Sequence, residues 1–171
     1  MAKSKAAVEQ AADAEWHETF RNSLFYWTGL LEDRYNQLFV KAMRPARVTV
    51  SRYRTLAILA ELDELTVNEL ARHSSIERSA LSRLLDQLER EALIVRRPHR
   101  ADRRALQIRI TATGRAAFAA MRPVRRAVLK RATEGITPGE IERMRMVIQL
   151  MLHNLDAAAG APKLRRAVAK R

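Results

Sequence analysis

The sequence predicts a mainly α-helical fold with one small β-hairpin, and three observations support this fold class. Apolar residues recur at steps of three and four along most of the 171-residue chain, which is the spacing of one face of an α-helix. Two capping boxes, at residues 66–69 and 137–140, mark the starts of helices. Between residues 93 and 110 the apolar period changes to two, as in half-buried strands. The chain is long enough for one domain, and its 47% of apolar residues can form a sizeable core.

The first predicted helix is long. It opens at Trp16 and ends before Pro45, because the residue before a proline avoids helical dihedral angles. Its apolar stripe comprises Trp16, Phe20, Leu24, Trp27, Leu31, Tyr35 and Leu38. Residues 1–14 carry no firm stripe and are predicted to form a loose arm.

Three shorter helices are predicted in the centre of the chain. The first opens at Ser51. The capping box at 66–69 starts a second helix that ends near His73, and residues 74–76 form a turn. The third helix, at about 77–91, has leucines at positions i, i+3, i+4 and i+7, which are Leu81, Leu84, Leu85 and Leu88.

Two short strands and two further helices complete the predicted fold. The strands lie at 93–95 and 106–110, where apolar and polar residues alternate. Helical spacing resumes over residues 113–132. The capping box at 137–140, which has a proline at the first helical position, starts the last helix, and its apolar stripe runs to Leu155.

This order of elements is that of a winged helix-turn-helix, in which two helices joined by a tight turn precede a hairpin. The leucine face of the helix at 77–91 must pack on the core, so its polar face points outward. An arginine on that face can bond guanine bidentately in the major groove, which is worth ~1–3 kcal/mol of discrimination between bases. The DNA contacts predicted for this motif are Ser75, Ser79, Ser82, Arg83 and Gln87.

The predicted hairpin is rich in arginine. Between Arg96 and Arg104 there are five arginines and a single acid, Asp102. An arginine carried on a thin β-ribbon fits the narrow, electronegative minor groove. Taken singly, each arginine is better explained as a solvated surface residue. The leucine spacing of the helix at 77–91, the capping box at 66–69 and the arginine-rich hairpin together favour duplex DNA as the partner. The contacts predicted here are Arg97, Arg100, Asp102, Arg103 and Arg104.

Composition bears on other classes of function. The formal net charge of +13 attracts polyanions, either nucleic acid or an anionic membrane surface. The absence of cysteine excludes disulfides, thiolate zinc sites and cysteine nucleophiles. The four histidines have no paired ligand spacing. We therefore expect neither a metal nor another cofactor. The sequence contains neither a glycine-rich phosphate loop nor a nucleophile elbow, so an enzyme is not expected. The sequence shows no secretory leader and no apolar run near the ~18 residues that span a bilayer. We therefore expect a cytoplasmic location and no membrane partner.

The sequence resembles the MarR family of transcriptional regulators over residues 16–155. The segments that carry the resemblance are 81–89 (LSRLLDQLE), 93–95 (LIV), 102–104 (DRR) and 108–111 (IRIT), with Gly114 after them. The chain departs from the family pattern at Ala92, where glycine is usual, and at Arg100-Ala101, which replaces an acid-proline pair. The second departure makes the hairpin tip more basic and leaves open whether Arg100 or Arg103 reaches deepest into the minor groove.

The resemblance implies a homodimer whose first, fifth and sixth helices interlock, with one winged domain on each side. It also implies that Arg83 contacts bases, that Arg103 enters the minor groove, and that Asp102 and Arg104 brace the wing.

The apolar stripes of the first and last helices independently predict a dimer, because a small winged domain cannot cover them; packing within the monomer is the alternative. A two-fold dimer would also set two recognition helices about one DNA turn, ~34 Å, apart. The predicted division is an arm at 1–14, a first dimerisation helix at 15–48, a DNA-binding region at 49–112, C-terminal dimerisation helices at 113–158 and a basic tail at 159–171.

The resemblance also implies a ligand site. Members of the family often bind anionic aromatic molecules, or their coenzyme A thioesters, between the dimer helices and the winged domain. Aromatic rings and arginines can hold such molecules by stacking and charge, although aromatics at helical spacing are more often core residues. A thiol-based peroxide sensor is not expected without cysteine. The candidate ligand contacts are Trp16, His17, Phe20, Trp27, Arg47, Tyr53 and Arg54.

The sequence therefore predicts a DNA-binding regulator, specifically a repressor that a small aromatic anion or its acyl thioester releases from a pseudo-palindromic operator. The alternative is a low-specificity architectural or anti-silencing protein that binds DNA without a ligand. That alternative would show steep salt dependence and little discrimination between sites.

Overall fold

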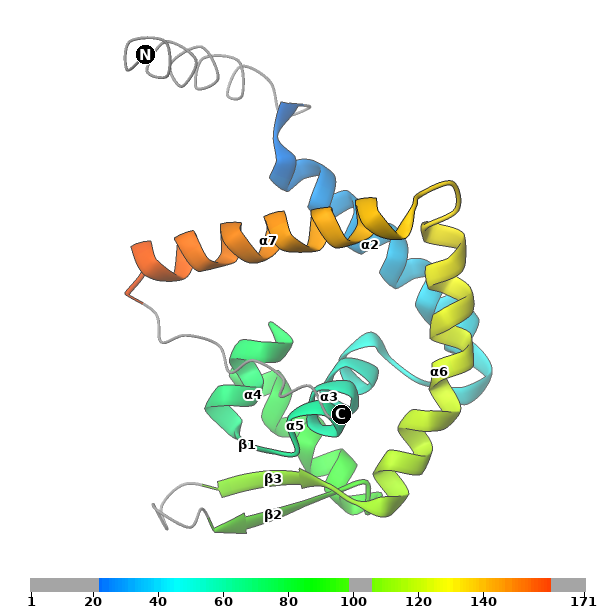
Figure 1. The fold of residues 1–171 in the computed structure, drawn as a ribbon. Helices are drawn as coiled ribbons and strands as arrows, with labels where there is room; N and C mark the ends of the chain where they lie inside the picture. Colours follow the sequence, from blue (N-terminus) through cyan, green and yellow to red (C-terminus); the bar gives the residue numbers. More distant parts are fainter. Residues whose placement is uncertain (1–21, 99–105, 161–171) are drawn as a thin grey trace.

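In the computed structural model the described residues are 22–98 and 106–160, and they form a mainly helical chain with one small sheet (Figure 1). Three long helices, α2, α6 and α7, lie along the right side and the top of Figure 1, and the sheet lies at the bottom with three shorter helices above it. The predicted fold class, mainly α with a small β-wing, is confirmed. The long helices are α2 (Leu24–Met43), α6 (Ala112–Ala132) and α7 (Pro138–Ala158).

Helix α2 starts later than the apolar stripe suggested. The backbone of Ser23 is extended (φ −72°, ψ 120°), so the helix begins at Leu24. The prediction of one continuous helix from Trp16 is therefore wrong at this point. Asn22 and Ser23 are weak helix formers, and serine is favoured at the position just before a helix. The residues of the predicted first helix that lie outside the described ranges include Trp16, His17 and Phe20.

Three short helices follow the 3₁₀ turn η2 (Arg44–Ala46). The predicted capping box is confirmed, because the Glu69 N–H donates to Thr66 Oγ1 at 3.3 Å and the Thr66 N–H donates to Glu69 Oε2 at 2.8 Å. After the second of these helices the chain turns at Ser75, which is in the left-handed conformation (φ 52°). The helices are α3 (Val50–Leu62), α4 (Val67–Ser74) and α5 (Arg78–Arg90).

The sheet is antiparallel, with strand order β1-β3-β2. The predicted hairpin is confirmed as β2 and β3, and Ile94 pairs with Ile110. Strand β1 was not predicted, because three residues are too short for an alternating pattern to show. It places Leu65 opposite Ile108, and both are fully buried. The strands are β1 (Glu64–Thr66), β2 (Ile94–Pro98) and β3 (Leu106–Ile110).

The core lies between the short helices and the sheet. Leu81, Leu85 and Leu88 of α5 are fully buried there, as their spacing predicts. The second predicted capping box, between Thr137 and Glu140, is also confirmed at the start of α7. No residue of α7 is buried within this chain.

The connection from α5 to β2 turns through Ala92, which adopts the left-handed conformation (φ 56°). The Ala92 N–H donates to the Glu89 carbonyl and the Leu93 N–H to the Leu88 carbonyl, both at 2.9 Å. These two bonds form a Schellman motif, which usually has glycine at the left-handed position. The departure from the family pattern at Ala92 therefore leaves the turn in place with a strained alanine.

Ala92→Gly is expected to stabilise the fold, because it removes the contact between Cβ and carbonyl oxygen that disfavours left-handed residues, at about 1–2 kcal/mol before the entropic cost of glycine. Urea unfolding followed by circular dichroism should show a higher midpoint with an unchanged slope. A lower midpoint would mean that Ala92 is not strained.

Candidate nucleic-acid interface

The outward face of α5 is the polar face predicted from the leucine spacing. Ser79, Ser82, Arg83 and Gln87 are all exposed, opposite the buried leucines. Arg83 forms no hydrogen bond or ion pair with any residue in the described ranges. Its charge contributes to the lowered pKa of Glu77, but the guanidinium breaks no hydrogen bond to the described part of the chain when it meets a partner.

The other predicted contacts on α5 already have partners. The Ser79 hydroxyl donates to the Glu77 carboxylate, and the Ser82 hydroxyl donates to the Arg78 carbonyl at 3.0 Å. Gln87 Nε2 donates to Glu91 Oε1, also at 3.0 Å. These three side chains would have to exchange or share partners to meet DNA, whereas Arg83 would not.

Helix α5 begins at an acidic cap that the sequence analysis did not identify. Glu77 Oε2 accepts from the N–H groups of Ser79 at 2.8 Å and Ala80 at 3.0 Å. The hydrogen bond from the Ser79 hydroxyl and those from the two backbone N–H groups lower the pKa of Glu77 from 4.5 to about 2. The signal was present, since an acid between a turn and an amphipathic stripe is a typical helix start.

This cap predicts a pH dependence. The pKa of Glu77 is lower in the folded chain than its ordinary value of 4.5, so the ionised cap stabilises the fold above that pH and is lost as the pH falls towards about 2. We expect Glu77→Gln to be less stable than wild type at pH 6, with the difference shrinking as the pH falls. Urea unfolding of both proteins across this range measures it; a constant difference at every pH would refute the assignment.

The far end of α5 is held by a second contact that sequence reasoning missed. Arg52 of α3 makes a bidentate pair with Glu91, and the Nη1–Oε1 distance is 2.8 Å. The hydrogen bond to Arg52 is the main cause of the lowered pKa of Glu91. Helix α5 is thus capped by Glu77 at its start and joined to α3 at its end.

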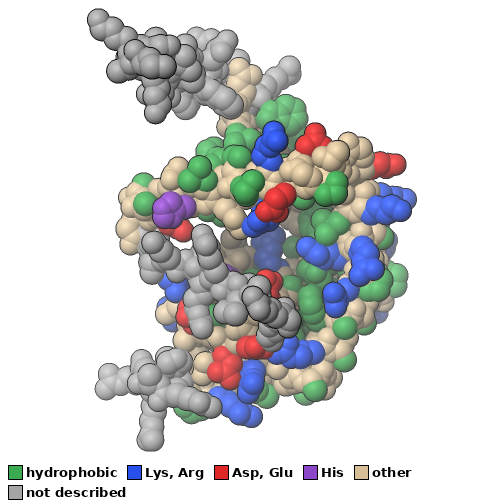
Figure 2. Space-filling view, in the orientation of Figure 1, with side chains coloured by type: hydrophobic (Ala, Val, Ile, Leu, Met, Phe, Trp, Pro, Cys, Tyr) green, Lys and Arg blue, Asp and Glu red, His purple; other side chains and the backbone are tan. Residues whose placement is uncertain are grey.

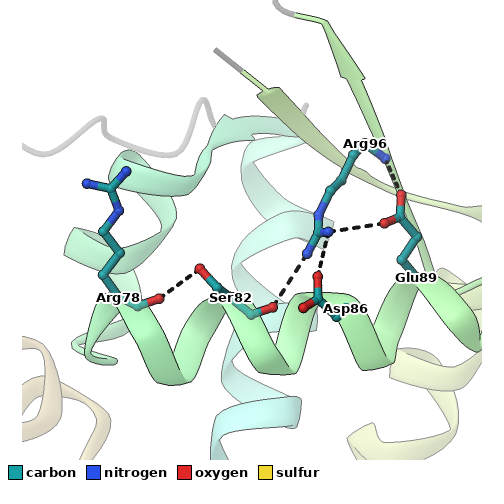
Figure 3. A network of polar contacts seen from close by, with 5 residues as sticks. All are labelled: Arg78, Ser82, Asp86, Glu89 and Arg96. Atoms are coloured by element: carbon teal, nitrogen blue, oxygen red, sulfur yellow. Dashed lines mark hydrogen bonds and ion pairs between the residues drawn. The ribbon is translucent and has the colours of Figure 1, made fainter. Parts of the chain in front are cut away.

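Arg97 is the predicted DNA contact of the hairpin that lies within the described residues. Arg97 is exposed on β2, where it pairs with Gln107 of β3. The neighbouring Arg96 is half-buried and turns back to α5, where it meets Asp86 and Glu89 (Figure 3). The predicted contacts that lie outside the described residues are Arg100, Asp102, Arg103 and Arg104.

Positive charge is concentrated away from α5. From Glu77 to Glu91 there are four acids and three arginines, whereas α6 carries six basic residues and no acid. Figure 2 shows lysine and arginine side chains gathered along the side formed by α6. Long-range attraction of a polyanion therefore does not come from α5, which suits a helix that selects among sequences rather than one that only attracts phosphate.

The predicted ligand contacts do not meet in one place within the described chain. Tyr53 is half-buried with its ring 5.0 Å from Phe39, and burial raises its pKa. Trp27 is 53% exposed and lies twelve residues before Phe39 on α2, which is about 18 Å along the helix axis. Arg54 donates to the Ser74 carbonyl at 3.0 Å and pairs with Glu32 at 2.8 Å.

The remaining candidate, Arg47, is exposed in the loop before α3, with a left-handed backbone (φ 52°). The described residues contain no cluster of three or more acidic or histidine side chains that could hold a metal. None of the described helices is long and apolar enough to cross a bilayer.

A groove of about 530 Å³ runs between α2 and α7. Its walls are almost entirely apolar, and Figure 2 shows hydrophobic side chains at this end of the molecule. The residues that line it include Leu24, Phe25, Leu31, Met144, Val147, Ile148, Met151, Leu152 and Leu155.

A tight turn between α4 and α5, followed by the β2–β3 hairpin, defines a winged helix-turn-helix protein, a class that inserts its second helix into the major groove of DNA. The family model of the MarR family matches residues 48–106. A MarR-family transcriptional regulator from Silicibacter pomeroyi is similar at 31% identity and a TM-score of 0.73, covering 82% of this chain and 94% of that one. The chain therefore belongs to the MarR family and is a DNA-binding transcription regulator.

Two other relatives are informative. The HTH-type transcriptional repressor IacR of Pseudomonas putida is 27% identical over 132 residues, which is 77% of this chain and 79% of IacR. BpsR of Bordetella bronchiseptica, described as a protein whose DNA binding is regulated by 6-hydroxynicotinic acid, shares the fold. It has 17% identity and a TM-score of 0.68, over 78% of this chain and 95% of that one.

Proposed function

We propose that the chain is a homodimeric repressor that binds a pseudo-palindromic operator through α5 and the wing, and that a small aromatic anion or its acyl-CoA thioester releases it. The observation that carries the proposal is the exposed Arg83, whose guanidinium makes no hydrogen bond or ion pair with the described residues, beside a hairpin attached to the same helix. The similarity to a repressor, IacR, supports the direction of regulation.

Dimerisation is supported by the apolar surfaces of α2 and α7. Phe25, Leu31 and Leu150 are each more than half exposed, and the groove between these helices is apolar. An exposed surface of this kind is unfavourable in a monomer, and a second copy of the same chain would cover it. In this proposal residues 15–48 and 113–158 supply the dimer contacts, and residues 49–112 bind DNA.

Val147→Glu is expected to convert the dimer to monomer. Val147 is half exposed in the single chain and lines the groove, so a carboxylate there leaves the fold intact but is buried unpaired in the dimer. Sedimentation equilibrium should give twice the chain mass for wild type and a mass near that of one chain for the variant. Gln149→Glu adds the same charge on the opposite side of α7 and is the control. A wild-type monomer, or a dimeric Val147→Glu, would contradict the interface.

The ligand part of the proposal rests on the aromatic and basic residues between α2, α3 and α6. Tyr53 packs between Phe39 and Phe118, with arginines of α6 close enough to affect its pKa. Arg54 joins α2 to the carbonyl end of α4. The dimer can adopt two conformations that differ in the spacing of its two recognition helices. A ligand that binds one conformation more tightly shifts the equilibrium towards it, by the difference in its affinity for the two. BpsR, whose DNA binding is regulated by 6-hydroxynicotinic acid, supports an aromatic acid as the class of ligand.

Fluorescence anisotropy of a labelled operator tests the ligand class. The operator is the duplex recovered by selection from a random library, and the probes are salicylate, benzoyl-coenzyme A and the neutral control benzyl alcohol. We expect an anionic probe to weaken operator binding and benzyl alcohol to leave it unchanged. If neither anionic probe weakens binding, this ligand class is wrong. The chain would then be either a regulator without a ligand or an architectural DNA-binding protein without a ligand.

A further inference from the structure

Arg96 of strand β2 reaches back across the outward side of α5, as Figure 3 shows. Its Nη1 lies 2.7 Å from Asp86 Oδ1 and 3.3 Å from Glu89 Oε2. Its Nη2 lies 3.5 Å from the Ser82 carbonyl, and its backbone N–H donates to Glu89 Oε1 at 3.1 Å. One residue of the wing therefore holds α5 at three positions along two turns of the helix.

We propose that Arg96 is a positioning residue that fixes the wing relative to the recognition helix α5, and thereby sets the spacing between major-groove and wing contacts that the protein accepts on DNA. This inference rests on the proposed function, in which α5 and the wing bind one duplex together. Arg96 itself makes no base contact in this account.

The geometry favours positioning over a simple surface pair. The Arg96 side chain is only 21% exposed, whereas its two carboxylate partners are 50% and 40% exposed, so the guanidinium is the sheltered member of the cluster. A planar guanidinium that bonds several acceptors has one preferred orientation, unlike a lysine ammonium. Beyond the backbone turn at residues 91–93, this cluster is the polar link between α5 and β2 in the described residues.

Arg96 has a second effect that the test must separate. Asp86 is exposed on α5 and repels phosphate unless it is neutralised. Loss of Arg96 therefore weakens binding to every duplex through charge. Loss of positioning, by contrast, changes only how strongly the protein distinguishes duplexes in which the two contacts are differently spaced.

The experiment compares two duplexes. One is the selected operator, and the other has a single base pair inserted between the segment protected in the major groove and the segment protected by the wing, a shift of about 3.4 Å along the axis. We expect the insertion to weaken wild-type binding by about tenfold or more, the size of one mismatched contact. Arg96→Gln should lose most of this penalty while binding both duplexes more weakly than wild type.

Two further variants keep the test decisive. Arg109→Gln removes an arginine of the same sheet that pairs with Glu64 at 3.4 Å, and it should keep the wild-type insertion penalty. Arg96→Lys keeps the charge but not the planar fork, so it should lose the penalty as Arg96→Gln does, and it serves alone if Arg96→Gln fails to fold.

The inference is overturned if the Arg96 variants keep the full penalty, which means that any loss of affinity is by the same factor for both duplexes. If wild type selects no operator, the proposed function fails instead, and the two failures are thus distinguishable.

Discussion

Arg83→Ala is expected to cause a large loss of operator affinity and discrimination. Arg83 stands exposed on the middle of α5, with no hydrogen bond or ion pair to the described residues, and the buried leucines of the helix fix its outward direction. A bidentate contact with guanine is worth about 1–3 kcal/mol per half-site, which is roughly 5- to 150-fold in affinity at each. Binding to unrelated DNA should change much less, because phosphate contacts dominate it.

Anisotropy titrations of the operator and of a scrambled duplex measure this. Arg83→Lys keeps the charge but cannot bond guanine bidentately, so it should lose discrimination while retaining most of the binding to scrambled DNA. Arg34→Ala, on the exposed face of α2, is the control and should match wild type. If Arg83→Ala discriminates as wild type does, α5 is not the helix that contacts bases.

Gly114→Ala is expected to destabilise the fold strongly. A Cβ at this position would lie 2.0 Å from the Leu93 carbonyl oxygen and 2.8 Å from Ile110 Cγ1. The Leu93 carbonyl cannot move freely, because it accepts the Thr111 N–H at 3.0 Å at the start of α6. Relief of the clash would have to shift backbone, so we expect a loss of about 3 kcal/mol or more, at the upper end of overpacking effects.

Urea unfolding measures this second effect. Gly139→Ala is the matched control, since a Cβ there meets no atom within 4 Å and its backbone is helical. It should be neutral or slightly stabilising. Wild-type stability in Gly114→Ala would contradict the close packing of α6 on the chain between α5 and β2.

The elements that could be predicted are those whose signals are local. The capping boxes at Thr66 and Thr137 each depend on residues within one helical turn, and the structure confirms both. The leucine spacing of α5 also predicted the outward side of that helix. The late start of α2 was missed, because an apolar stripe can cross a break in the backbone at Ser23 without losing its period.

The parts of the site that could not be predicted depend on contacts between distant residues. The pair between Arg52 and Glu91 joins positions 39 residues apart. No spacing rule assigns such partners. In the sequence Arg96 is one of five hairpin arginines, and nothing there indicates that it lies 2.7 Å from Asp86.

Selection of bound duplexes from a random library, performed at two salt concentrations, tests whether the chain is a dimeric, sequence-specific regulator. A dimer that binds through α5 and the wing should select a two-fold symmetric motif whose half-sites are about one helical turn, ~34 Å, apart and which persists at the higher salt concentration. Enrichment without a motif, lost as the salt concentration rises, would contradict it, because binding would then come from the general attraction between a chain of net charge +13 and phosphate.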